Sequence, residues 1–172
     1  LISQVNKGLA SARNTILMNA VGSWLLYLDS DDMLQDNAIA RIEEEIRNHP
    51  EADIIAPSMK CFGLNNDPVI LMPEPKIEDF RAGNRIGYCA AVRKSILLAV
   101  GGYDPTMIWG YEDLMLWCVL LNRGAKIVTI PDILWLYRVR QESMISEAKK
   151  HHQELLDIIN KKIPTAQLNF KA

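Results

Sequence analysis

The sequence lacks the features that mark several classes of protein. Its longest apolar run, residues 114–121, is much shorter than the roughly 20 residues that a membrane-spanning helix needs. The only three cysteines, which form no CxxC pair and no zinc-ligand spacing, are Cys61, Cys89 and Cys118. They are predicted to be reduced, buried thiols in a cytosolic domain. The 19 Lys and Arg residues are scattered among 21 Asp and Glu residues, so no basic stripe indicates a nucleic-acid partner.

The composition that is present fits one ordinary globular domain. The chain has 172 residues, of which 49% are hydrophobic and 23% are charged. A chain of this length can bury a sizeable core without disulfides or metal ions. No internal repeat, low-complexity tract or linker divides the sequence. The composition therefore predicts a single domain of the α/β or α+β class.

The hydrophobic pattern predicts alternating helices and strands. Helices are expected at residues 11–20, 34–48, 94–100, 111–122 and 144–163, and strands at 24–28, 53–57, 86–92, 126–130 and 134–139. Residues 63–85 are expected to form a long loop. The continuous apolar run at 24–28 is typical of a strand covered on both faces, which favours a mostly parallel sheet. The apolar helix faces are predicted to contain Ile16 and Ala20 in one helix, and Ile39, Ile42 and Ile46 in the next.

An acidic cluster, Asp29-Ser30-Asp31-Asp32, directly follows the strand at 24–28. In an extended backbone, residues i and i+2 point the same way, so Asp29 and Asp31 present two carboxylates to one side. Like charges held this close repel unless a cation lies between them, and carboxylates suit Mg²⁺ or Mn²⁺ with positions left for phosphate oxygens. The alternative is structural: Asp31 or Asp32 could cap the helix that starts near Leu34.

A second acidic pair lies in the segment Trp109-Gly110-Tyr111-Glu112-Asp113. The two acids open a buried helix directly after a glycine turn, where the helix dipole is expected to lower an acid's pKa and keep it ready to accept a proton. The alternative is ordinary helix-end chemistry. An aromatic ring beside the acids offers a face for a sugar, although a Trp is more often a core residue.

These motifs together resemble the family 2 glycosyltransferases of the GT-A fold. The resemblance spans most of the chain and rests on Asn6-Lys7-Gly8, Ala12-Arg13-Asn14, Leu28-Asp29-Ser30-Asp31-Asp32, Gly101-Gly102-Tyr103-Asp104, Gly110-Tyr111-Glu112-Asp113 and Tyr137-Arg138. It implies an α/β fold, an incomplete GT-A sandwich with a mostly parallel sheet. It also implies an inverting transfer of a sugar from a nucleotide-diphosphate donor to an acceptor hydroxyl, as in bacterial polysaccharide biosynthesis.

The resemblance also implies roles for residues of the donor side. Asp31 would bind the Mg²⁺ or Mn²⁺ that bridges the diphosphate, and Asp29 would face the same metal or the ribose of the donor. Asp32 would support the site or contact the sugar, and Ser30 would belong to the same donor-binding segment. Arg13 would lie near the donor, where a guanidinium suits phosphate or sugar oxygens.

On the acceptor side, the resemblance implies that Asp113 is the general base that takes the proton of the acceptor hydroxyl. Glu112 would fix the acceptor or the donor sugar. Trp109, Gly110 and Tyr111 would form the acceptor-binding segment. A base that acts in a single displacement must lie opposite the leaving group.

Two departures from the family pattern shape the expectation. Arg140 stands where the family commonly has a metal-binding His, and an Arg can hold a diphosphate directly. The opening segments that hold the nucleotide base are absent, which predicts an N-terminally truncated fragment. In this interpretation residues 1–143 are the C-terminal portion of a catalytic domain, with the diphosphate and acceptor sides, and residues 144–172 form a C-terminal helix and tail.

Competing interpretations stay open at this point. The chain could be a non-catalytic module of the same fold that binds a glycan or a protein, which Arg140 would fit. A metal-phosphate hydrolase is the third option, and the Tyr137-Arg138 pair disfavours it. The expected partners are a UDP-sugar and a glycan or lipid-linked acceptor in the cytoplasm. The Lys149-Lys150 and Lys161-Lys162 pairs would either form a solvated face or touch anionic lipid at a membrane, and His151 and His152 are expected to be surface and stripe residues.

Overall fold

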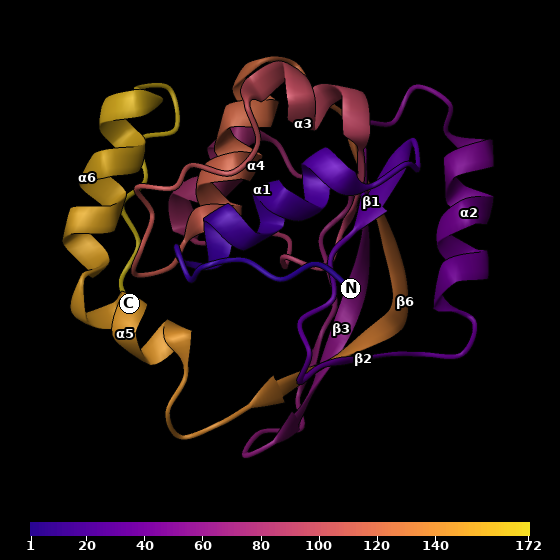
Figure 1. The fold of residues 1–172 in the computed structure, drawn as a ribbon, viewed down its shortest axis with the longest axis horizontal. Coiled ribbons are helices and arrows are strands. Elements are labelled where there is room, and N and C mark those ends of the chain that lie inside the picture. The colour runs from indigo at the N-terminus through magenta and orange to yellow at the C-terminus, as the bar shows by residue number, and fades with distance from the viewer.

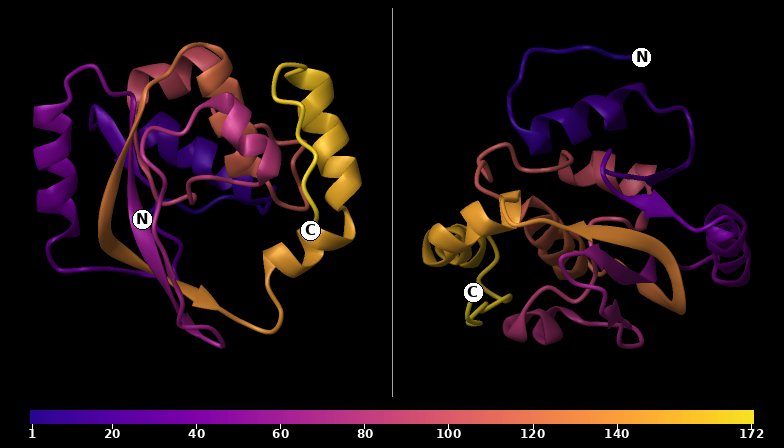
Figure 2. Two further views of the ribbon diagram at one scale, coloured as in Figure 1. Left: turned by 180° about the vertical axis from the view of Figure 1, so that it is seen from behind. Right: turned by 90° about the horizontal axis from the view of Figure 1, so that it is seen from below.

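The computed structural model describes all residues from 1 to 172 as one α/β sandwich (Figure 1). The helices are α1 (Leu9–Asn19), α2 (Ala38–Asn48), α3 (Lys94–Val100), α4 (Glu112–Asn122), α5 (Met144–Lys150), α6 (His152–Lys162) and the 3-10 helix η1 (Ile77–Ala82). The strands are β1 (Trp24–Leu26), β2 (Met33–Leu34), β3 (Ile54–Gly63), β4 (Pro68–Val69), β5 (Ala91–Arg93) and β6 (Ile127–Val139). Helix α2 covers one face of the sheet, and the other helices lie on the opposite side (Figures 1 and 2).

The sheet has the strand order β1-β5-β3-β6-β2, with β4 paired to β3. The long central pair β3 and β6 is parallel, from Ile54 opposite Ile127 to Gly63 opposite Val139. All the other pairings are antiparallel. The prediction of a mostly parallel sheet is therefore wrong, and the sheet is mixed. The apolar run at 24–28 indicates that other layers cover this strand on both faces. Such burial does not determine whether neighbouring strands run parallel or antiparallel.

Several element bounds differ from the sequence prediction for identifiable reasons. The strands expected at 126–130 and 134–139 are one strand, β6, whose register with β3 shifts between Ile130 and Ile133. Pro131 and Asp132 have no partner residue in β3 there, so the missing N–H of Pro131 costs no ladder hydrogen bond. Ile16 of α1 and Ile39 of α2 are 47% and 51% exposed, so these two positions were misplaced. The rest of the predicted α2 face is confirmed, because Ile42 is buried and Ile46 packs against the same cluster. In α1 the buried positions are Ala10, Arg13 and Leu17 instead.

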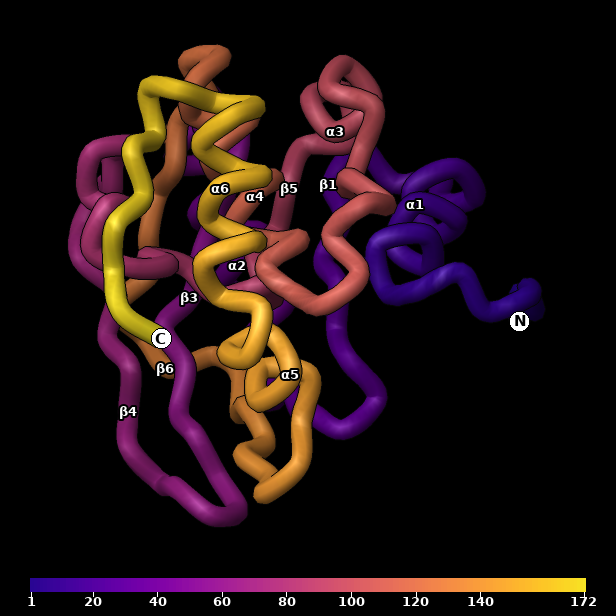
Figure 3. The backbone as a smooth tube through the Cα atoms, turned by 90° about the vertical axis from the view of Figure 1, so that its left-hand side faces the viewer, coloured from indigo at the N-terminus to yellow at the C-terminus, as the bar shows by residue number.

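The C-terminal segment is two helices rather than the single helix expected at 144–163. His151, with φ −104° and ψ 17°, separates α5 from α6 and turns the chain between them. After α6 the tail runs back along that helix toward α5 (Figure 3). No helix in the structure has the length and apolarity that crossing a membrane would require.

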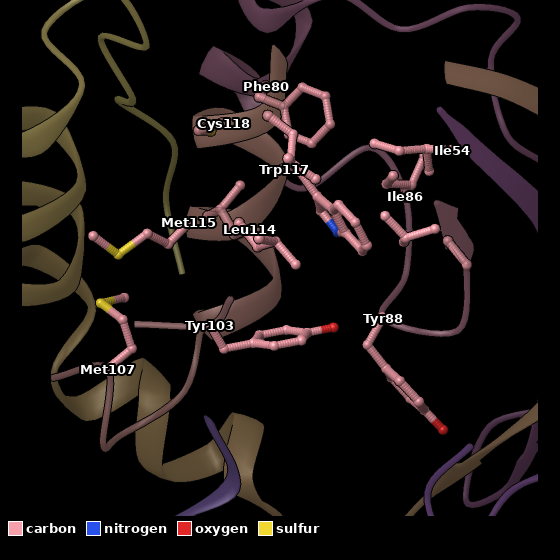
Figure 4. Packing of buried hydrophobic residues seen from close by; sticks show 14 of the residues in the cluster. Ile54, Phe80, Ile86, Tyr88, Tyr103, Met107, Leu114, Met115, Trp117 and Cys118 are labelled. Carbon is pink, nitrogen blue, oxygen red and sulfur yellow. The ribbon is translucent and has the colours of Figure 1, made fainter. Parts of the chain in front are cut away.

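The core has two parts, one on each face of the sheet. The larger part lies under α4, where Trp117, Tyr103 and Phe80 are among the largest fully buried side chains (Figure 4). Leu155 and Ile159 of α6 belong to this same cluster, so the C-terminal segment shares the core of the preceding residues. The smaller part lies under α2 and consists of Ala38, Ile42, Ala52, Ile55, Ala91, Ile130 and Leu134. All three cysteines are buried and unpaired, as expected.

Candidate functional site

A buried arginine joins the two acidic segments that the sequence singled out. Helix α1 places Arg13 in the interior, where it is 2% exposed. Its Nη1 donates to Oε1 of Glu112 at 2.6 Å, and its Nη2 donates to Oδ1 of Asp29 at 3.2 Å. Arg13, Asp29 and Glu112, which are separated in the sequence, therefore form one charged cluster. The guanidinium can neutralise both carboxylates at once.

Aromatic rings surround the guanidinium of Arg13. Its Cζ atom lies 4.8 Å from the ring centre of Tyr88, 5.4 Å from that of Tyr103 and 6.0 Å from that of Tyr27. Ring faces attract cations, most strongly where water is excluded. Tyr103 belongs to a motif that the sequence indicated, whereas Tyr27 and Tyr88 were not predicted, because only the tertiary fold brings these separate segments together.

Asp32 is a structural anchor of the acidic cluster. It is 8% exposed, and its Oδ2 accepts a hydrogen bond from the Tyr88 hydroxyl at 2.6 Å while its Oδ1 accepts from the backbone N–H of Arg138 at 2.8 Å. Burial raises the pKa of Asp32, and both hydrogen bonds oppose this effect. Helix α2 begins at Ala38, so the alternative that Asp31 or Asp32 caps it is wrong.

Asp29 and Asp31 face more open space than Asp32. The Oδ2 of Asp31 lies 3.1 Å from Nη2 of Arg140, and these side chains are 36% and 55% exposed. Ser30 lies exposed between the two aspartates. No group of three His, Cys, Asp or Glu side chains forms a metal-ligating cluster. Two carboxylates still fit Mg²⁺ or Mn²⁺, because Mg²⁺ at phosphate sites commonly takes one or two carboxylates and fills its shell with phosphate oxygens and water.

The second acidic pair opens α4. Glu112 is 5% exposed and held by Arg13, whereas Asp113 is half-buried. The Oδ2 of Asp113 accepts from Nδ2 of Asn84 at 3.0 Å, and its Oδ1 accepts from the backbone N–H of Leu114 at 2.7 Å. Burial raises the pKa of both carboxyls, that of Glu112 to about 7, although Arg13 opposes the shift. The expectation that the helix end lowers the pKa of these acids is therefore wrong, because desolvation outweighs the opposing contributions of Arg13 and of backbone hydrogen bonds.

The residues before Glu112 have an unusual backbone. Gly110 has φ +128° and Tyr111 has φ +59°, both in the region that side chains disfavour. The Trp109 ring is 36% exposed and stacks on the His151 ring with 4.3 Å between ring centres. One face of the Trp109 ring, which was predicted to bind the acceptor, is thus covered by His151. His151, expected to be a surface residue, is half-buried and also packs on this ring.

A pocket of about 340 Å³ lies over these groups. Its lining includes Arg13, Asp29, Asn84, Tyr88, Glu112 and Asp113, together with Met144, Ile145, Ala148, Lys149 and Phe170 of the C-terminal segment. A neighbouring pocket of about 260 Å³ is lined by Arg138, Arg140, Ser143, Ser146 and Lys149. Both pockets share Tyr137, Ile145 and Lys149, so the second pocket, which has Arg138, Arg140 and Lys149 and no acid and is called the basic chamber, adjoins the first.

Comparison with known proteins identifies the family. The sequence profile of glycosyl transferase family 2 matches residues 1–101. Two uncharacterized glycosyltransferases of Haemophilus influenzae are similar to the chain. One is 28% identical over 141 residues, covering 78% of this chain and 51% of the relative, and the other is 29% identical over 118 residues, covering 64% and 40%. The chain belongs to glycosyl transferase family 2, and it spans about half the length of the curated relatives it matches.

Solved structures agree on the fold. S. aureus TarS 1-349 in complex with UDP-GlcNAc superposes with a TM-score of 0.75 at 17% identity, covering 98% of this chain and 50% of that one. TarS 1-349 without that ligand gives a TM-score of 0.73 at 18% identity, with 97% and 48% covered. The α/β sandwich is thus of the GT-A type, as the sequence motifs predicted. Two expectations stay predictions: that the chain is an N-terminally truncated fragment, and that its catalytic portion ends at residue 143.

Proposed function

We propose that this chain forms the diphosphate and acceptor side of an inverting glycosyltransferase, which transfers a sugar from a UDP-sugar to an acceptor hydroxyl. The observation that carries the proposal is that Asp29, Arg13, Glu112 and Asp113 border one pocket of about 340 Å³. Family membership and a fold shared with a structure that holds UDP-GlcNAc support the same conclusion.

In this proposal the donor's diphosphate lies across Asp31 and the basic chamber. Asp29 and Asp31 would hold Mg²⁺ or Mn²⁺, whose charge would stabilise the departing diphosphate. Arg140, 3.1 Å from Asp31, and Arg138 border the adjoining pocket and would supply further positive charge. A guanidinium matches two phosphate oxygens at once, so the arginines compensate for the absence of a third metal ligand.

In the same pocket, Asp113 would act as the general base. Its carboxylate takes the proton of the acceptor hydroxyl while the hydroxyl oxygen attacks the anomeric carbon opposite the diphosphate, which inverts the configuration. The bond from Asn84 orients this carboxylate, and its raised pKa makes it a stronger base than an ordinary aspartate. Glu112 is tied to Arg13 and would position the sugar or Arg13 rather than accept the proton.

Replacement of Asp113 by Asn in the full gene product tests the proposal. Turnover of UDP-sugar should fall by about 10²–10⁴-fold, the usual contribution of a general base, with little change in the KM for the donor. Asp157→Asn, at an exposed position of α6, is the matched control and should leave turnover unchanged. Unchanged turnover in the Asp113 variant would remove this residue as the base.

The second candidate function is a non-catalytic module that binds a glycan or a protein. The ion pair between Arg140 and Asp31 favours it, since a permanent pair would compete with a metal. Calorimetry with UDP and Mn²⁺, on residues 1–172 and on the full gene product, distinguishes the two. Binding of UDP that depends on Mn²⁺ supports the enzyme. Absence of both UDP binding and transfer in the full gene product supports the module. Contact with anionic lipid stays a proposal, and Lys150 and Lys162 already pair with Glu147 and Asp104.

A further inference from the structure

Two consecutive histidines connect the C-terminal segment to the catalytic end of α4. His151 and His152 lie where α5 meets α6. The His151 ring stacks on Trp109 with an interplanar angle of 4°, and Nδ1 of His152 lies 2.9 Å from the Tyr111 hydroxyl. Trp109 and Tyr111 of the loop before Glu112 are thus held by two adjacent histidines of a distant segment. The tail that follows α6 runs beside that helix (Figure 3).

The hydrogen bonds of His152 define its tautomer. Its Nε2 lies 2.6 Å from the carbonyl oxygen of Phe170, and a carbonyl can only accept, so Nε2 carries the proton and donates it. In the neutral imidazole Nδ1 is then unprotonated and accepts from the Tyr111 hydroxyl. Both ring nitrogens are satisfied by this arrangement, which links α4, α6 and the tail through one side chain.

The loop that His152 holds is strained and closely packed. Tyr111 has φ +59° and is the residue that directly precedes the first turn of α4. A Cβ on Gly110 would lie 2.9 Å from the Cβ of Ala148, so α5 packs directly against the loop backbone. A non-glycine residue in this region is strained and persists only where its surroundings hold it, commonly at functional sites.

We propose that His152 is a positioning residue for the transfer reaction, which acts by holding Tyr111 and thereby the acids that follow it. This inference rests on the proposed function. Glu112 and Asp113 are the next residues after Tyr111, and their contacts with Arg13 and Asn84 require the start of α4 at its observed place. A displacement of about 1 Å at a catalytic group can cost 10²-fold in rate. The C-terminal segment therefore contributes to catalysis by positioning these acids.

Kinetics of matched variants in the full gene product test the inference. His152→Ala and Tyr111→Phe should each lower kcat by about 10- to 100-fold with an unchanged KM for the UDP-sugar. The double variant should be no worse than either single one, because both remove the same hydrogen bond. His152→Asn, which keeps an acceptor near the position of Nδ1, should recover part of the loss. Gln153→Ala, whose side chain only donates to exposed Asp157, is the control and should match the wild type. Additive losses, or equal losses in the control, would overturn the inference.

A spectroscopic readout separates this inference from the proposed function. Nitrogen-15 NMR of the imidazole in the full gene product should report an unprotonated Nδ1 and a protonated Nε2 for His152. Tyr111→Phe should shift the Nδ1 resonance. A protonated Nδ1 overturns the positioning role, even in a protein that transfers sugar normally. A wild type without transfer activity would overturn the proposed function, and the catalytic part of this inference with it, while the expected NMR signature would still establish the link between α6 and α4.

Discussion

Replacement of Arg13 by Met is the sharpest test of how the site is held together. The change removes a guanidinium that is 2% exposed and leaves the carboxylate of Glu112, itself 5% exposed, without its partner at 2.6 Å. Removal of one member of a buried ion pair costs about 3–5 kcal/mol. The pair with Asp29 adds little, because that side chain is 36% exposed and solvent screens it. The variant should therefore lose a large share of the roughly 5–15 kcal/mol typical of a folded domain.

Urea unfolding, followed by tryptophan fluorescence, measures this loss. With a denaturant slope of about 2 kcal/mol per molar urea, the midpoint should fall by about 1.5–2.5 M. Arg47→Met is the matched control, since its side chain is 69% exposed and its pair with Glu43 spans 3.9 Å. The control should change the free energy of unfolding by less than about 0.5 kcal/mol. A loss below about 1 kcal/mol in the Arg13 variant would refute the view that this residue neutralises a buried charge.

The pH dependence of the Arg13 variant gives an independent check. Burial raises the pKa of Glu112 to about 7 in the folded protein, and Arg13 opposes that rise, so its removal raises the pKa further. Folded protein then binds the proton more tightly than unfolded protein does. The deficit relative to the wild type should grow as the pH rises through 7 and shrink below it, where the carboxyl is protonated in both folded proteins. Equal deficits at pH 5.5 and pH 8.5 would contradict this account.

Other changes probe neighbouring features. Gly110→Ala should destabilise the fold by about 1–3 kcal/mol, because its φ is +128° and the new Cβ would lie 2.9 Å from Ala148; an unchanged melting temperature would contradict this. Tyr88→Phe removes the donor to Asp32 and should cost about 1–3 kcal/mol in urea unfolding, whereas no change would mean that the hydrogen bond is not formed. Arg140→Ala should weaken UDP binding about ten-fold by calorimetry, and unaltered affinity would place the diphosphate elsewhere.

The sequence predicted well where a local signal was strong. The helix at 94–100 was predicted with the bounds that α3 has, since the glycine pair after it gives a clear stop. Helix α4 begins one residue after its predicted start. The apolar face of α1 was misjudged because its most important buried residue is a charged one, Arg13, which no hydrophobic pattern can reveal. Strand direction in the sheet was misjudged because it depends on connections between distant segments.

For the candidate site, the sequence provided the acids and not the groups that organise them. Asp29, Glu112 and Arg13 were singled out from motifs, and the structure brings them together. The contribution of Tyr88, and that of the histidines in the C-terminal segment, depends on tertiary packing. His152 is 41 residues away from Tyr111 in the sequence, a separation at which spacing carries no information on contact.

The bridge between Arg13 and Glu112 also affects how the protein is made. The two residues are 99 positions apart in the chain. At a synthesis rate of about 5–20 residues per second, Arg13 is added to the chain roughly 5–20 s before Glu112. During this interval Arg13 has only the partly exposed Asp29 as a partner, so burying its charge in the final place of α1 is costly. Completion of α4 is thus the event that lets α1 settle, and a nascent chain that stops before residue 112 should be readily cleaved by proteases around α1.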